Sequence, residues 1–398
     1  METYGNMTID PRTLTRNWNY PTSIRFGPGR IAELPAVCRE LGMKRPLLVT
    51  DPGLRKLPMI GGALASLRAA GLGEAVFSDI QTNPVGRNVR AGVACYGRVG
   101  CDGVIAFGGG SALDVGKAIA LMIGQTRPLW DFEDREDWYT RVSTAGMAQT
   151  IAVPTTAGTG SEVGRASVIV DETTHLKKII FHPKMLPAVV ISDPELTVGL
   201  PPRLTAATGM DALAHCLEAY CAPGFHPPAD GIALEGVRLI KEWLPVAVKD
   251  GKNVAARAHM LAAACMGATA FQKGLGAIHS LSHPVGAHFD SHHGETNAVV
   301  MPYVLQFNRP AIEEKMTRLA RYLNLPQPGF QAVLSWVLAL RKEIGIPDTL
   351  ADLGVKESDL DLLVPEAVDD PSTGGNPRPA GAAEMREMFL NAIHGRLS

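Results

Sequence analysis

Residues 101–120 read CDGVIAFGGGSALDVGKAIA, an apolar run that leads through three glycines into a segment rich in Ala and Leu. This pattern predicts a buried β-strand, a glycine-rich turn and a helix capped by Ser111. Glycines let the backbone approach an anion closely, and the free amides and dipole at a helix start favour phosphate. The stretch therefore predicts a pyrophosphate-binding turn in an α/β fold, although glycines in such turns also serve structure alone.

The spacing within this turn excludes two common phosphate motifs. It lacks the G-x-G-x-x-G pattern of a Rossmann fingerprint. A Walker A loop needs four residues before its second glycine and Ser or Thr after its lysine. Here the interval from Gly110 to Gly116 is one residue longer, and Ala118 follows Lys117.

Similar apolar runs flank this stretch at residues 46–50 (PLLVT), 150–153 (TIAV) and 188–191 (AVVI). A parallel sheet covered by helices on both faces requires such runs. Past Pro201 and Pro202 they give way to helical patterns over residues 204–220, 229–246, 255–267 and 310–322. We therefore expect a doubly wound α/β domain over residues 1–200 and an all-helical domain over residues 201–398.

Composition bounds the class of protein. The 398 residues suffice for two domains, and 46% hydrophobic with 20% charged residues is typical of globular proteins. The formal charge of −2 gives no overall field that attracts nucleic acid or anionic lipid. No signal-peptide core opens the chain, and no uninterrupted apolar stretch reaches the ~18 residues of a membrane helix. Six scattered cysteines without a CxxC pair predict reduced thiols. We expect a cytoplasmic protein with neither nucleic acid nor membrane as partner.

A second anion-friendly turn lies at residues 153–162, VPTTAGTGSE. Its hydroxyls and glycines supply donors for a phosphate or ribose, although a polar loop with a helix cap has the same composition. Asp51 ends the run PLLVT, where a carboxylate can bind a ribose diol and repel a 2′-phosphate, which favours NAD over NADP. The alternative for Asp51 is a turn residue before Pro52 and Gly53.

Two groups of residues predict a metal site. Asp211 and His215 stand at i and i+4, which places them on one helix face about 6 Å apart, as a chelate or as a hydrogen-bonded surface pair. Five of the 11 histidines fall within a short stretch, at positions 279, 283, 288, 292 and 293. One carboxylate with three imidazoles suits Fe(II), Zn or a similar ion, not Mg or Ca. Spacing nominates His279 and His283 as the remaining ligands, but Pro284 predicts a disturbed helix, and His292 or His293 could reach in from the next loop.

These motifs together resemble the iron-containing, group III alcohol dehydrogenases. The matching segments are GGGSALDVGK (108–117), PTTAGTGSEV (154–163), DPELTVGLPPRLTAATGMDALAHCLEAY (193–220) and GLGAIHSLSHPVGAHFDSHHGETNAVVMPYVLQFN (274–308). They occur in the family's order, and the resemblance covers about residues 20 to 395. It implies an N-terminal nucleotide-binding domain, a helical C-terminal domain that holds the metal, catalysis in the cleft between them, and a homodimer.

Carried over by motif position, the resemblance implies that the metal is bound by Asp211, His215, His279 and His293. His283 would then lie beside the nicotinamide as a catalytic residue. The implied contacts to NAD(H), in preference to NADP, come from Asp51, Asn83, Gly109, Gly110, Ser111, Thr155, Thr156, Thr159, Lys177 and Leu196. The implied metal is a single divalent ion, Fe(II) ahead of Zn.

The implied reaction is hydride transfer between the nicotinamide and a metal-bound alcohol or aldehyde. Gly164 and Ala166 stand where many members carry larger residues, which predicts a pocket for substrates larger than ethanol. Intact ligands favour this reaction over a maleylacetate reductase-like one, a polyol or hydroxy-acid dehydrogenase remains an alternative, and a non-catalytic metal- or nucleotide-binding protein is disfavoured. Relatives that act on phosphates or carboxylates, such as 3-dehydroquinate synthase, would be expected to carry more basic residues than the matched motifs do.

Overall fold

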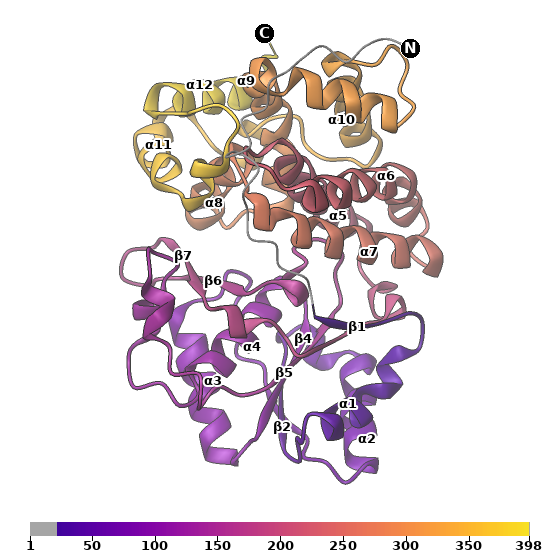
Figure 1. Ribbon diagram of the computed structural model, residues 1–398, viewed down its shortest axis with the longest axis vertical. Coiled ribbons are helices and arrows are strands. Elements are labelled where there is room, and N and C mark those ends of the chain that lie inside the picture. The colour runs from indigo at the N-terminus through magenta and orange to yellow at the C-terminus, as the bar shows by residue number, and fades with distance from the viewer. Residues whose placement is uncertain (1–21, 398) are drawn as a thin grey trace.

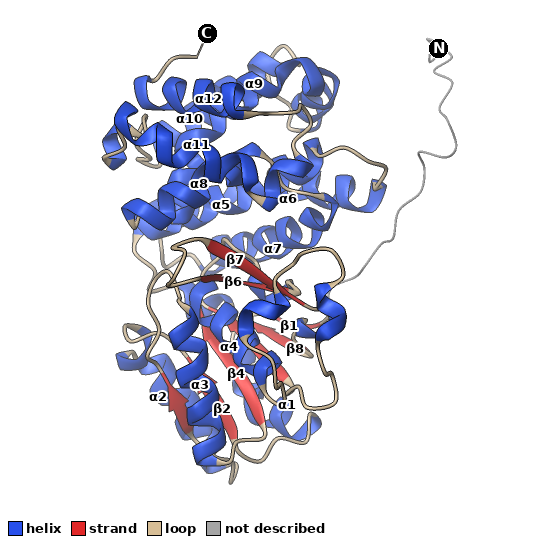
Figure 2. Cartoon of the chain, turned by 90° about the vertical axis from the view of Figure 1, so that its left-hand side faces the viewer, coloured by secondary structure: helices blue, strands red, loops and turns tan. Residues whose placement is uncertain are grey.

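The computed structural model describes residues 22–397 (Figure 1). The N-terminal residues on which the expectation of no signal peptide rests lie outside this range. Within it, the chain forms an α/β half and a helical half stacked on one another (Figures 1 and 2).

A six-stranded parallel sheet, in the order β1-β8-β5-β4-β2-β3, forms the centre of the α/β half. Its strands are β1 (Ser23–Phe26), β2 (Pro46–Val49), β3 (Ala75–Phe77), β4 (Gly103–Gly108), β5 (Thr150–Pro154) and β8 (Val189–Ser192). Every residue of β2, β4, β5 and β8 is buried, which is why these strands read as continuous apolar runs. The four strands predicted from these runs are confirmed.

Helices cover both faces of this sheet. They are α1 (Leu34–Glu40), α2 (Pro58–Ala69), α3 (Gly86–Val99) and α4 (Gly110–Met122). Leu47 and Val49 of β2 pack with α3 and α4 in one core cluster, whereas Leu48 between them packs with α1 and α2 in another. Because successive side chains of a strand point to opposite faces, this division places one pair of helices on each face. The doubly wound α/β architecture is confirmed.

A separate antiparallel hairpin, β6 (Ala166–Val170) with β7 (Lys177–Phe181), stands outside the main sheet. Its strand β6 packs against α4, and its strand β7 reaches α8 of the helical half. Figure 1 shows the hairpin between the two halves. The sequence patterns did not separate these strands from the parallel sheet.

The helical half contains α5 (Pro202–Cys221), α6 (Pro227–Lys249), α7 (Val254–Ala270), α8 (Ala277–Phe289), α9 (His293–Tyr322), α10 (Phe330–Glu343), α11 (Leu360–Asp369) and α12 (Ala382–His394). Helix α5 is its centre, since nearly all of its side chains are buried against α6, α7 and α9. The all-helical C-terminal half is confirmed. The expected disturbance at Pro284 is wrong, because α8 continues through this residue.

One helical segment in the described part of the chain, Val254–Lys273, is long and apolar enough to cross a bilayer. In the structure 56% of its apolar window is buried. It packs against α5 and α6, so its composition is that of a core helix of the helical half.

Candidate metal centre and cofactor cleft

The glycine-rich turn joins β4 to α4 and closes onto the second predicted turn. Gly108 has φ +154°, a conformation that side chains rarely adopt. A Cβ on Gly110 would lie 2.7 Å from Thr159 Oγ1, and one on Gly109 would lie 3.3 Å from Thr156 Cγ2. The two turns predicted to bind the cofactor therefore face each other, so closely that the glycines leave no room for side chains at these positions.

The second turn also contacts the helical half. A Cβ on Gly158 would lie 2.8 Å from Thr208 Cβ on α5, and one on Gly160 would lie 2.3 Å from Ala268 Cβ on α7. Glycines at these positions allow the loop to pass between the halves. The turn at residues 153–162 therefore lies in close contact with α5 and α7 of the helical half.

Ser111 does not cap α4 as expected. The residue before this helix is Gly109, and no side chain caps it. Instead, the Ser111 hydroxyl donates a hydrogen bond to the Thr82 carbonyl oxygen at 2.5 Å. The neighbouring Asn83 donates from Nδ2 to Asp290 Oδ1 of the helical half at 2.7 Å. Ser111 and Asn83 therefore lie close together at the junction of the two halves.

Asp51 holds a turn and also faces the glycine-rich turn. Its Oδ1 accepts hydrogen bonds from the amides of Gly53 and Leu54, both at 2.9 Å. Its Oδ2 lies 3.7 Å from the place a Cβ on Gly108 would take. The interpretation of Asp51 as a turn residue is confirmed, and Oδ2 is the atom placed toward the proposed cofactor site.

The remaining candidate cofactor residues lie in three different places. The amide of Thr155 donates to the Gly108 carbonyl oxygen at 3.0 Å, and Leu196 is buried in the cluster that contains Phe107. Lys177, at the start of β7, places Nζ 3.0 Å from where a Cβ on Gly286 of α8 would lie. Burial lowers the pKa of Lys177 to about 8 against the opposing effect of nearby carboxylates.

Four side chains from three helices meet at one point. Asp211 and His215 lie on α5, His279 lies on α8, and His293 begins α9. The Nε2 atoms of His215, His279 and His293 lie 4.0, 4.0 and 3.6 Å from Asp211 Oδ1. The alternative of a surface pair between Asp211 and His215 is wrong, because both are buried and their nearest charged atoms are too far apart to bond.

The protonation states of His215 and His293 favour metal binding. Burial lowers the pKa of His215 to about 4 and that of His293 well below its ordinary value, so both imidazoles are neutral near pH 7. At His279 burial lowers the pKa, but the Glu218 carboxylate outweighs it and the pKa is raised. Because Glu218 bonds Nδ1 of His279, the proton is assigned to Nδ1 and Nε2 faces Asp211.

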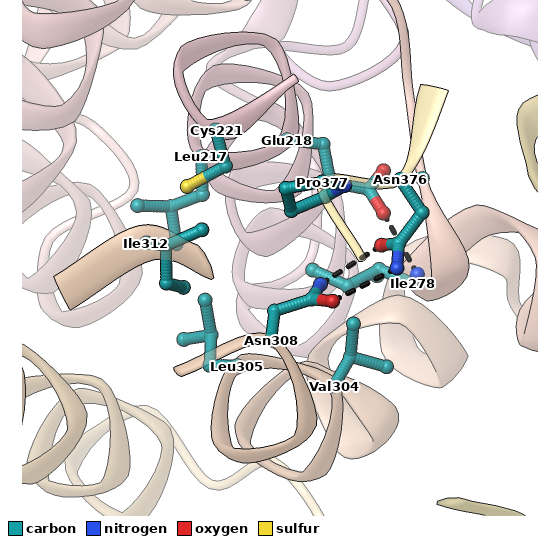
Figure 3. Close-up of a pocket in the computed structure, with 11 residues that line it drawn as sticks. Leu217, Glu218, Cys221, Ile278, Val304, Leu305, Asn308, Ile312, Asn376 and Pro377 are labelled. Atoms are coloured by element: carbon teal, nitrogen blue, oxygen red, sulfur yellow. Dashed lines mark hydrogen bonds between the residues drawn. The ribbon is translucent and has the colours of Figure 1, made fainter. Parts of the chain in front are cut away.

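Glu218 is a functional residue that sequence reasoning missed. One of its carboxylate oxygens bonds His279 Nδ1, and the other accepts from the Ile278 amide at 2.7 Å. Its spacing of seven residues from Asp211, on the same helix face, was the available signal. Figure 3 shows Glu218 near the paired amides of Asn308 and Asn376, beside a cavity of about 10 Å³. That cavity has room for about one water molecule and not for a substrate.

The donor set fits a divalent cation. Asp211, His215 and His279 offer ligand atoms that all lie within 4.8 Å of one another. The side-chain nitrogen of Asn297, Nδ2, lies 2.8 Å from Asp211 Oδ1, 3.3 Å from His279 Nε2 and 3.2 Å from His293 Nε2. These three atoms therefore converge on one point. One carboxylate together with imidazole nitrogens is a donor set that suits Fe(II) or Zn.

His283 lies beside this cluster. Its ring centroid is 5.3 Å from that of His293 and 5.8 Å from that of His279. Its Nδ1 bonds Asp370 Oδ2 at 2.7 Å. Burial raises the pKa of Asp370, but His283 and the Ser372 amide outweigh it, and the pKa falls to about 2. No local pattern predicts Asp370, which lies 87 residues from its partner.

A cavity of about 280 Å³ opens between the two halves next to the cluster. Phe271 lines it, and the Phe271 ring centroid lies 5.1 Å from that of His215. Gly164 and Ala166, the two small residues noted in the sequence, also line this cavity. Ser372 of the helical half lines it as well. The cavity therefore adjoins the four converging side chains.

Comparisons with known proteins agree with this arrangement. Residues 21–194 match the family model "Iron-containing alcohol dehydrogenase", and residues 205–393 match "Fe-containing alcohol dehydrogenase family, C-terminal". A 4-hydroxybutyrate dehydrogenase of Cupriavidus necator is 41% identical, over 94% of this chain and 99% of the relative. An NAD-dependent methanol dehydrogenase of Bacillus methanolicus is 36% identical, over 95% and 100%. A crystal structure of 1,3-propanediol oxidoreductase superposes with a TM-score of 0.90 at 37% identity, over 95% and 100%. The chain therefore belongs to the iron-containing alcohol dehydrogenase family and is an oxidoreductase of that family.

Proposed function

We propose that this chain is a metal-dependent, NAD(H)-linked alcohol dehydrogenase or aldehyde reductase. The observation that carries the proposal is the convergence of Asp211, His215, His279 and His293 beside an interdomain cavity. When bound, a divalent cation supplies Lewis-acid polarisation of an alcohol or aldehyde oxygen, and NAD(H) accepts or supplies the hydride. Fe(II) is proposed ahead of Zn.

The two halves divide this work. We assign the cofactor to residues 1–200, which contain both predicted phosphate-binding turns, and the metal to residues 201–398, which contain the four converging side chains. The bond between His283 Nδ1 and Asp370 fixes the tautomer that leaves His283 Nε2 able to take up or return a proton. The family resemblance further supports a homodimer in the cytoplasm.

The relatives indicate the chemical class of the alcohol and not a single substrate. Those compared above are named for 4-hydroxybutyrate, methanol and 1,3-propanediol. All three carry a primary alcohol, so a primary alcohol or its aldehyde is proposed as the reacting group here.

A substrate panel with metal analysis on the same preparation tests the proposal. We expect NADH absorbance to change with primary alcohols or aldehydes, to stop when a chelator removes the metal, and to return with Fe(II) or Zn. Turnover that survives complete metal removal would overturn the metal-dependent reaction. A protein that binds metal and NADH but turns over no alcohol or aldehyde would be a binding protein instead.

Replacing Asp51 by asparagine is expected to reduce the preference for NAD over NADP about fivefold to tenfold in kcat/KM. The charge that repels the 2′-phosphate is lost, and two charges about 4 Å apart in water interact by ~1 kcal/mol. The asparagine oxygen can still accept the Gly53 and Leu54 amides that hold the turn. Steady-state kinetics with both cofactors measure this ratio, and an unchanged ratio would show that Asp51 only holds the turn.

A further inference from the structure

The interdomain cavity has a single basic side chain in its described lining, that of Arg165. Within residues 22–397, its guanidinium has neither a carboxylate oxygen within 4.0 Å nor a hydrogen-bond partner. Nearby cations differ, since Lys178 bonds Asp171 at 2.8 Å and Arg135 bonds Glu133 at 2.7 Å. Arg165 is therefore a cation at a substrate-sized cavity, and no carboxylate of the described residues forms an ion pair with it.

The backbone around Arg165 is fixed by the protein. The buried Lys117 donates to the carbonyl oxygens of Ser161 and Ala166, on either side of it. The Arg165 carbonyl oxygen accepts from the His182 amide at 3.2 Å. The guanidinium carbon lies 5.6 Å from the centroid of the Phe181 ring, which is a cation–π contact.

The same cavity is bounded by residues that contact the reacting end of the site. Phe271 packs against His215, as described above. Pro371 and Ser372 line the cavity directly after Asp370, which bonds His283. Apolar side chains such as Ile179 and Leu275 form part of the wall between these features. A chain of methylene groups suits this wall, with a polar group at each end.

We propose that Arg165 binds the carboxylate of the substrate and that the substrates are ω-hydroxy carboxylates and the corresponding semialdehydes. The guanidinium fork matches a carboxylate with two parallel hydrogen bonds. The hydroxyl or aldehyde end then lies toward the four converging side chains. This inference rests on the function proposed above. Arg165 lies just after the matched motif at residues 154–163, so the small number of basic residues in the matched motifs does not include it.

Asp134 allows a second test of whether the positive charge of Arg165 binds a substrate carboxylate. It is the acidic residue in the described lining of the cavity. Its pKa is raised by burial, with the Arg165 charge acting in the opposite direction. Since its carboxylate competes with a substrate carboxylate for Arg165, Asp134→Asn is expected to raise kcat/KM for an acidic substrate about twofold to fivefold.

The experiment compares 4-hydroxybutanoate with 4-hydroxybutanamide, its uncharged counterpart, on the metal-loaded enzyme. Arg165→Gln is expected to lower kcat/KM for the acid about 100-fold, because a charge-assisted bidentate contact is lost. The same variant is expected to change kcat/KM for the amide less than about threefold. Arg165→Lys should restore part of the loss, since it keeps the charge without the fork. The control Arg386→Gln, on α12, should change neither.

Each contrary outcome has a separate meaning. An equal loss for acid and amide in Arg165→Gln would overturn carboxylate binding and leave Arg165 a structural residue. A wild-type enzyme that prefers the amide or butan-1-ol would overturn the substrate class while leaving the proposed dehydrogenase intact. Preference for 3-hydroxypropyl phosphate over the acid would overturn the carboxylate in favour of a phosphate. Failure of the wild-type enzyme on every alcohol would instead count against the proposed function itself.

Discussion

His279→Ala is expected to lose its bound metal and to lower kcat/KM for alcohols about 1,000-fold or more. The change removes one of the four converging ligand atoms and leaves the Glu218 carboxylate, which bonds His279 Nδ1, without its partner. Loss of Lewis-acid stabilisation accounts for several kcal/mol of the barrier, and each ~1.4 kcal/mol is tenfold in rate. Metal analysis, circular dichroism and kinetics on one preparation measure the three effects, with the helical spectrum expected to persist.

His288→Ala is the matched control on the same helix. His288 is exposed on α8, and its imidazole bonds Glu366 and not Asp211. This variant is expected to keep its metal and to stay within about twofold of the wild-type rate, as surface changes commonly do. Full metal-dependent turnover by His279→Ala would remove His279 from the proposed site.

Gly294→Ala is expected to weaken metal binding about 100-fold and to lower the free energy of unfolding by about 2 kcal/mol or more. A Cβ at Gly294 would lie 2.2 Å from the Ala207 carbonyl oxygen and 2.9 Å from Asp211 Cβ. Both contacts involve α5, so the start of α9 must move away and carry His293 with it. Overpacking of this kind costs about 1–3 kcal/mol. Changes to the residues that position metal ligands typically cost about 10–100-fold in metal affinity.

Gly62→Ala is the control for the second prediction. Gly62 is an exposed glycine inside α2, and a Cβ there would meet nothing within 4 Å. Alanine in this position is expected to stabilise the protein by about 0.5–1 kcal/mol with unchanged metal affinity. Thermal unfolding and metal titration compare the two variants. If Gly294→Ala behaves like Gly62→Ala, close approach of α9 to α5 is not what places His293.

The parallel sheet and the helical half could be predicted because their signals are local. Strands such as β4 are buried on both faces and appear as unbroken apolar runs, and the change to helical patterns after Pro202 is visible in composition. The hairpin β6–β7 could not be separated in the same way. Its strand β6 alternates buried and partly buried residues, yet it lies among the runs of the sheet. Pairing between strands is set by tertiary contacts that a short segment does not specify.

Prediction of the candidate site shows the same division. Histidine density and spacing indicated the cluster, but they left open whether His283, His292 or His293 faces Asp211, because that depends on how α9 meets α5. Asp370 could not be found, since its bond to His283 joins distant parts of the chain. Arg165, which stands between Gly164 and Ala166, could not be identified from the sequence. A lone arginine gives no sign of whether it has an ion-pair partner.

The hairpin β6–β7 bears on how such an enzyme acquires new substrates. It hydrogen-bonds outside the main sheet, yet positions 164–166 at its base line the cavity. Lys117 donates its hydrogen bonds to backbone carbonyl oxygens at this place and not to side chains. A change of side chain therefore leaves these hydrogen bonds in place. A randomised library confined to these three positions should diversify the accepted chemistry while sparing the nucleotide-binding scaffold. Selectivity and stability would then evolve on separate parts of one polypeptide.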